Sequence, residues 1–137
     1  MLLTFTKPEF EDLIKDGIKK HTIRADKGNR WKVGNSIQFW RGNPRNTRGK
    51  VKPRQFGTGT ATRVETIKME FKDVHPLEHH DIVSIGTCVL DTSQQLDALA
   101  VNDGFKNWSE MREWFDNDSR QFIGKIIFWN YAKCVWS

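Results

Sequence analysis

The sequence predicts a small α+β domain in which five or six strands form a mixed β-barrel with two or three helices outside it. A length of 137 residues suffices for one domain with a substantial core, but not for two. The apolar fraction of 37% and the aromatic fraction of 12% suit a globular protein. Runs with strand character outnumber those with helical periodicity. We therefore treat residues 1–137 as a single domain.

The N-terminal elements are a short strand and a helix. Apolar residues predict a strand over Leu2–Phe5. Pro8 then stands where proline best opens a helix, and Gly17 is a natural residue to end it. The apolar stripe of this helix consists of Phe10, Leu13 and Ile14.

The remaining elements follow from apolar patterns separated by polar or glycine-rich segments. After the strand that follows Gly17 we expect a loop at 26–31, a turn at 33–35 and a strand at 37–40. A loop rich in Gly, Pro and Arg occupies about 42–58, longer than a tight hairpin needs, and such loops are often functional. The later elements are strands at 58–71, 82–90 and 122–131, a polar connection at 75–81, and helices at 94–101 and 108–115.

The segment from Gly17 to Arg24 is the most informative part of the chain. Side chains alternate between the faces of a strand, so Lys20, Thr22 and Arg24 share one face, and His21 and Ile23 take the other. Three polar groups on one face indicate a bound anion or nucleobase. The alternative is an exposed edge strand whose charges prevent aggregation.

Charge is distributed very unevenly along the chain. The formal net charge is +5, yet no acidic residue occurs between Asp26 and Glu65, an interval with ten Lys and Arg. The rest of the chain carries 12 basic and 17 acidic residues, a net charge of −5. A basic segment on an otherwise acidic chain predicts a surface that binds a polyanion.

The basic segment favours RNA over a membrane as its partner. Trp31, Trp40 and Phe56 alternate with the cations and are able to stack on unpaired bases, unless they are buried in the core. Glycines and prolines interrupt the segment, which excludes an amphipathic basic helix. The residues expected to contact RNA are Lys20, Arg24, Arg30, Trp31, Arg41, Arg45, Arg48, Lys50, Lys52 and Arg54.

Other features point to a cytoplasmic protein without a metal or another cofactor. The N-terminus lacks the pattern of a signal peptide, and no apolar run is long enough to span a membrane. Cys88 and Cys134 are expected to be reduced thiols. His75, His79 and His80 suggest a metal site, but Pro76 prevents the helix that would place two of them together. The sequence leaves the oligomeric state open.

The pattern G-x-K-x-x-T-I-R followed by a Val-Gly turn resembles the ASCH domain, a member of the PUA-like barrel superfamily. Gly17, Lys19, Thr22, Ile23 and Arg24 carry the match, followed by Val33-Gly34. Asp103-Gly104-Phe105 and the segment at 108–111 resemble a second part of the family pattern. The resemblance covers most of the chain except 42–58, and it implies a PUA-like barrel associated with RNA binding.

A bacterial subgroup of this family hydrolyses N4-acetylcytidine, and the resemblance implies a catalytic set of Lys19, Thr22 and Glu110. A crowded, partly desolvated lysine acts as a base, while Thr22 is the nucleophile or positions a water. Glu110 passes the proton to the departing amine, and Arg24 holds a carbonyl or phosphate oxygen. Lys19 and Thr22 meet only if Lys19 precedes the strand, and we place it in the turn after Gly17.

Three functions remain open at this point. RNA or nucleic-acid binding without turnover ranks first, because the cations at 42–58 suit a polymer better than a free nucleoside. A nucleoside amidohydrolase ranks second and a ribonuclease third. Two of the site residues have structural alternatives: Asn107 and Glu110 form a helix capping box, and Arg24 pairs with Asp26 or Asp103.

Overall fold

The computed structural model has a mixed α+β fold with a seven-stranded sheet, a separate two-stranded sheet and three helices. It describes residues 1–45, 52–75, 78–79 and 81–133. The strands are β1 (Leu2–Phe5), β2 (His21–Arg24), β3 (Ser36–Arg41), β4 (Arg54–Glu70), β5 (Asp73–His75), β6 (Glu78–His79), β7 (Ile82–Ile85), β8 (Cys88–Leu90) and β9 (Gln121–Lys133). The helices are α1 (Pro8–Lys15), α2 (Ser93–Asn102) and α3 (Trp108–Phe115).

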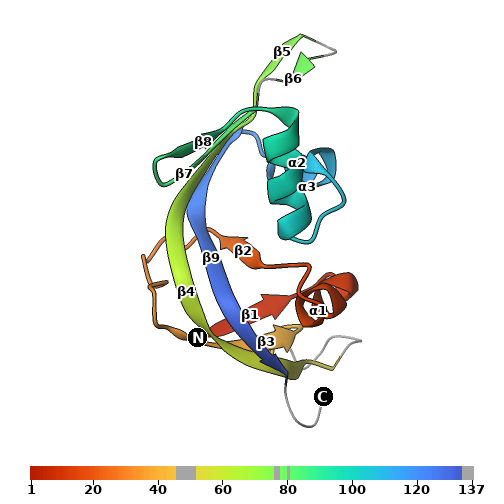
Figure 1. Cartoon of the computed structure of the whole chain (residues 1–137), viewed down its shortest axis with the longest axis vertical. Coiled ribbons are helices and arrows are strands. Elements are labelled where there is room, and N and C mark those ends of the chain that lie inside the picture. The colour runs from red at the N-terminus through yellow and green to blue at the C-terminus, as the bar shows by residue number, and fades with distance from the viewer. Residues whose placement is uncertain (46–51, 76–77, 80, 134–137) are drawn as a thin grey trace.

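Two long antiparallel strands organise the sheet. β4 pairs with β9 along almost its whole length. The pairing begins with Gly57 of β4 opposite Lys133 of β9 and ends with Glu70 opposite Gln121. β3 and then β1 extend the sheet from one end of β4, and β7 and β8 extend it from the other. Figure 1 shows β4 and β9 as a curved pair with all three helices on its concave side. The helices therefore cover one face of the sheet.

The predicted barrel is not closed. β2 pairs with β9, and β1 pairs with β3, so β1 and β2 are both edge strands. No ladder joins β1 to β2 in the part of the chain that the structure describes. One side chain crosses this opening instead, because Arg24 Nη2 donates a hydrogen bond to the main-chain oxygen of Thr4 at 2.8 Å. We call the opening between these two strands the β1–β2 seam.

The first helix forms as its sequence predicts. Pro8 is at its first position, and Phe10 and Ile14 are buried on one face. After its last residues, Gly17 takes a φ of +74°, a left-handed conformation that glycine adopts without steric cost. The chain reverses there, so Lys19 lies before β2 begins at His21, as predicted.

The core is rich in aromatic rings. Phe39 and Phe56 are fully buried, and both lie near the ring of Phe5, with centroids 6.4 and 6.3 Å away. Trp31 is 7% exposed, so packing in the core accounts for it and for Phe56. Trp40 is half-buried, and its indole nitrogen donates to Gln38 on the same strand. These positions favour the structural alternative for the aromatic residues of the basic segment.

Three segments of the chain differ from the sequence-based expectation. The loop predicted at about 42–58 ends earlier, because β4 begins at Arg54 and pairs there with Arg41 of β3. The single strand predicted over 82–90 is a hairpin of β7 and β8, because Gly86 takes a φ of +57° and turns the chain. The polar connection predicted over 75–81 contains the short strands β5 and β6. Residues 76, 77 and 80 lie outside the described residues.

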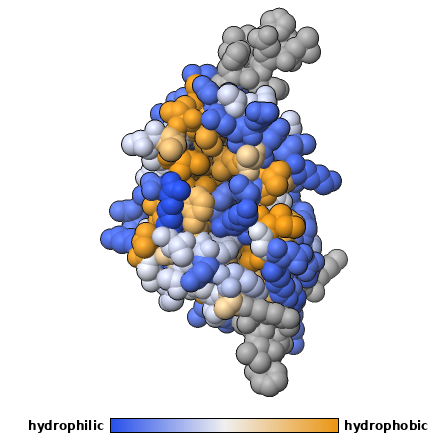
Figure 2. All heavy atoms as spheres, viewed as in Figure 1, coloured by the Kyte–Doolittle hydropathy of each residue, from blue (hydrophilic) through white to orange (hydrophobic). Residues whose placement is uncertain are grey.

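The surface seen in the orientation of Figure 1 is mixed in character. Hydrophobic atoms reach the surface in its upper and central parts, and hydrophilic atoms surround them (Figure 2). Among the described residues, no helix has the length and apolar character needed to cross a membrane.

Candidate functional site

A cavity of about 160 Å³ lies at the β1–β2 seam. Its walls come from β1 and the residue that follows it, from Lys19 and β2, from α1 and α3, and from the segment that follows α2. Its lining residues are Thr4, Phe5, Thr6, Phe10, Lys19, Thr22, Ile23, Arg24, Asp103, Phe105, Trp114 and Phe115. We call it the seam cavity.

Lys19 is the most deeply buried polar group of the cavity, with 1% of its surface exposed. Its ammonium donates to the main-chain oxygens of His21, at 2.9 Å, and Asp103, at 2.6 Å. It also lies 3.5 Å from the Asp103 carboxylate and 4.4 Å from the centre of the Phe10 ring. These contacts hold the ammonium in one place.

Burial lowers the pKa of Lys19 from its ordinary value of 10.5 to about 8. The charge of Asp103 acts in the opposite direction, and the nearby cations Arg24 and Lys7 lower the pKa further. Lys19 therefore remains mostly charged at pH 7 but loses its proton within an accessible pH range. This behaviour suits either an anion-binding group or a base.

Asp103 joins the two sides of the site. It follows the last turn of α2, is 2% exposed, and its carboxylate contacts Nδ1 of His21 at 2.8 Å as well as Lys19. The main-chain N–H of Lys20 donates to the carbonyl of Asn102 at 2.7 Å, which fixes the end of α2 against the start of β2. Asp103 is thus the carboxylate of the cavity.

The carboxylate that the resemblance implied, Glu110, lies elsewhere. It is on α3, and Lys7 Nζ donates to its side chain at 3.2 Å. Its main-chain N–H donates to the Asn107 side chain at 2.9 Å, so the N-cap half of the predicted capping box is present, while its side chain contacts Lys7 instead. Glu110 does not line the seam cavity. The family resemblance implied Glu110 for the catalytic set, whereas the fold brings Asp103 to Lys19.

Thr22 and Arg24 face the cavity together, as alternation along β2 predicted. Arg24 is bonded to Thr4 through Nη2, while its buried Nε has no hydrogen-bond partner among the described residues. Burial lowers the pKa of its guanidinium below its ordinary value, while the charge of Asp103 raises it. Arg24 does not form the predicted pair with Asp26. Lys20, predicted on the same face, precedes β2 and is exposed to solvent.

The other residues predicted to bind RNA are spread over a wider surface. Arg30, Trp31 and Arg45 line a separate hollow of about 420 Å³. Arg41 and Arg54 are neighbours across β3 and β4, and Arg54 forms an ion pair with the buried Glu11 at 2.6 Å. Lys52 is exposed, whereas Arg48 and Lys50 lie outside the described residues, as does part of the predicted loop at 42–58.

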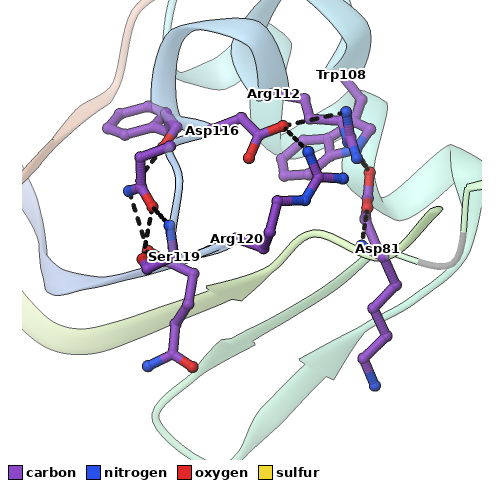
Figure 3. A network of polar contacts seen from close by, with 10 residues as sticks. Asp81, Trp108, Arg112, Asp116, Ser119 and Arg120 are labelled. Atoms are coloured by element: carbon purple, nitrogen blue, oxygen red, sulfur yellow. Dashed lines mark hydrogen bonds and ion pairs between the residues drawn. The ribbon is translucent and has the colours of Figure 1, made fainter.

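A further hollow of about 420 Å³ lies beside α3, and its charges are largely paired. Arg112 donates to the buried Asp81 at 2.8 Å, and Arg120 donates to Asp116 at 2.8 Å. Trp108 also donates to Asp81 at 2.8 Å (Figure 3). One oxygen of Asp116, Oδ1, is buried without a hydrogen-bond partner among the described residues. The contacts to Asp81 attach α3 to the chain before β7.

Among the residues that the structure describes, no three His, Cys, Asp or Glu side chains lie close enough together to bind a metal ion. Comparison with protein-family models, with curated proteins and with solved structures finds no match to this chain.

Proposed function

We propose that this chain is an RNA-binding domain of the ASCH, PUA-like type, whose seam cavity holds a single base or phosphate. One observation carries the proposal: a residue that lines the cavity has a buried hydrogen-bond donor without an acceptor. Arg24 Nε has no hydrogen-bond partner among the described residues, and Thr22 lines the same cavity. A buried donor without a partner costs free energy, and an oxygen of a ligand would satisfy it.

The charges and walls of the cavity support the same ligand. Lys19 and Arg24 carry positive charge, and Asp103 supplies the one carboxylate among the described residues that line the cavity. Aromatic rings form much of the remaining wall, including Phe10 and Trp114. Flat apolar walls accept a planar base, while the cations accept a carbonyl or phosphate oxygen. The small volume limits the ligand inside the cavity to one such group.

The test is a titration of the four ribonucleosides and of short single-stranded RNAs into the wild-type protein and Thr22→Val. Valine keeps the shape of threonine but removes its hydroxyl, so we expect the affinity to fall by about tenfold. Thr58→Val is the matched control, because Thr58 is exposed on β4 away from the cavity. Binding that is the same in all three proteins would contradict the proposal.

A second candidate is hydrolysis of N4-acetylcytidine or a similar amide, favoured by the pKa of about 8 for Lys19 in a cavity shared with Thr22. Neutral Lys19 would accept the proton of Thr22 or of a water as its oxygen attacks the acetyl carbon. The carbon–nitrogen bond then breaks, the amine takes the proton, and water completes release of acetate. In this proposal Asp103 takes the role that the motif assigned to Glu110.

Chromatography of N4-acetylcytidine incubated with the protein tests this second candidate. Cytidine should form with the wild type and with Lys20→Ala, but not with Lys19→Ala. Lys20 is the matched control because it is adjacent in sequence and exposed. No cytidine from the wild type, or equal amounts from all three, would remove Lys19 from a hydrolytic mechanism. We do not propose a ribonuclease, because nothing specific in the described residues favours one.

A further inference from the structure

A second hollow, of about 420 Å³, is lined by residues at the start of the chain and in β1, by the loop that follows β2, and by Arg45. Leu2 and Asp26 line the hollow, whereas Thr4 and Arg24 line the cavity. Leu2 and Thr4 are two residues apart in the chain, as are Arg24 and Asp26, and along a strand this separation is about 7 Å. The hydrogen bond from Arg24 to Thr4 therefore lies between the two spaces. A ligand that fills both would pass this guanidinium.

The hollow is strongly cationic. Lys27, Arg30 and Arg45 line it, all three are exposed, and none has an ion-pair partner among the described residues. They belong to two segments, the loop after β2 and the chain after β3, so the fold brings them together. Three unpaired cations around one concave surface attract an anion more strongly than the same charges dispersed would.

The carboxylate that lines the hollow, Asp26, is occupied by the protein itself. Asp26 accepts hydrogen bonds from the main-chain N–H groups of Arg30 at 2.8 Å and Trp31 at 3.0 Å. Its backbone takes a φ of +43°, so the loop folds back on its own carboxylate. Asp26 thus shapes the loop that presents Lys27 and Arg30, and it does not form an ion pair with either side chain.

We propose that this hollow binds the phosphate of the nucleotide whose base enters the seam cavity. The inference rests on the function proposed above and makes its ligand more specific: a nucleotide unit of RNA rather than a free nucleoside. Arginine and lysine at the hollow supply hydrogen bonds and charge to phosphate oxygens. Arg24 lies between the seam cavity and the hollow, where it is placed to contact the ribose that joins the base to the phosphate.

The experiment compares dissociation constants of ribonucleosides, their 5′- and 3′-monophosphates and an RNA tetranucleotide. The proteins are the wild type, Lys27→Gln/Arg30→Gln, and the control Lys32→Gln/Lys106→Gln, which removes two exposed charges that line neither space. We expect a monophosphate to bind the wild type at least about fivefold more tightly than its nucleoside. The hollow variant should lose that advantage, and the control should keep it.

Salt dependence gives a second measurement. The slope of log K for the tetranucleotide against log salt should be shallower in the hollow variant than in the control, by about 0.7 for each phosphate that the variant no longer neutralises. Nucleosides should bind both variants equally well. Equal reductions in affinity in the hollow variant and the control would mean that only net charge matters, and would overturn the inference.

The outcomes separate this inference from the function on which it rests. If Thr22→Val weakens binding while the hollow variant does not, the cavity binds the ligand and the hollow is not its phosphate site. Suppose instead that the tighter binding of monophosphates over nucleosides is lost in the hollow variant, but Thr22→Val binds like the wild type. The base then does not enter the cavity, and both the proposed function and this inference are wrong in the form given. If the wild type binds no probe, both are overturned.

Discussion

Lys19 and Asp103 lie far apart in the sequence, yet the Lys19 ammonium is 2.6 Å from the Asp103 main-chain oxygen and 3.5 Å from its carboxylate. Both residues are almost fully buried, with 1% and 2% of their surfaces exposed. The pair links the turn before β2 to the end of α2 at the wall of the seam cavity. Its protonation and its packing therefore affect both ligand binding and stability.

The pH dependence of the two candidate functions should have opposite signs. Lys19 is charged below pH about 8 and neutral above it. If it binds an anionic group, affinity should be constant at lower pH and fall as pH rises through about 8. If it acts as a base, turnover should instead rise through the same pH. Affinity for a cytidine tetranucleotide and N4-acetylcytidine turnover, each measured from about pH 6.5 to 9.5, test this. Either profile should disappear in Lys19→Met, and a profile that persists would exclude Lys19 as its cause.

Removing the cavity carboxylate should destabilise the fold. Asp103→Asn keeps the size of the side chain but leaves buried Lys19 without its opposing charge, which we expect to cost about 3 kcal/mol of unfolding free energy. The pKa of Lys19 should also fall further, since the charge of Asp103 raises it. Urea unfolding measures the first effect. Asp118→Asn, at an exposed position, should be neutral, and equal stability of the two variants would contradict a role for the pair.

Glu110→Gln should leave binding or turnover almost unchanged. Its side chain contacts Lys7, and its capping contact uses the main-chain N–H, which glutamine retains. The ion pair is partly exposed, so the decrease in unfolding free energy should stay below about 1 kcal/mol. Affinity and turnover are measured beside Asp103→Asn. A larger functional defect in Glu110→Gln would restore the catalytic set that the motif implied.

Two physical effects favour glycine at position 104: its left-handed backbone conformation and the close packing around it. Comparison with Gly34, which has only the first, separates them. Gly104 has a φ of +95°, and an added Cβ would lie 3.0 Å from the Phe10 ring and 3.1 Å from Lys19 Cδ. Gly34 has a φ of +93° with no atom within 4 Å of its added Cβ. Gly34→Ala should cost about 1 kcal/mol from backbone strain, and Gly104→Ala about 1–2 kcal/mol more from crowding. Thermal unfolding of both variants measures the difference, and equal destabilisation would show that the cavity wall yields freely.

The network around Asp81 should be essential for stability. Asp81 accepts hydrogen bonds from the Trp108 indole, the Arg112 guanidinium and the main chain of Lys72 (Figure 3). Asparagine offers only one acceptor oxygen and turns its NH₂ toward donors, so Asp81→Asn should lower the unfolding free energy by about 3 kcal/mol. Glu113→Gln, exposed on the same helix as Arg112, should be neutral in the same urea titration. Similar midpoints for the two variants would contradict this role.

Local patterns predicted most elements because they depend on neighbouring residues. Pro8 and Gly17 delimit α1 closely, and β1 spans the predicted Leu2–Phe5. The errors occur where one residue changes the direction of the chain. Gly86 interrupts a run that otherwise alternates like a single strand, and its left-handed conformation makes a hairpin. In a single strand Val89 would share a face with the buried Val83, whereas in the hairpin Val89 is exposed.

The sequence by itself determined that Thr22 and Arg24 share one face of β2, since side chains alternate along a strand, but not that Ile23 also lines the seam cavity. Only the tertiary structure decided which carboxylate meets Lys19, because the main chain of Asn102 bonds to Lys20 and brings Asp103, not Glu110, to the cavity. It also decided that the sheet stays open between β1 and β2. Spacing along the chain specifies faces of single elements, whereas contacts between distant elements depend on how those faces pack.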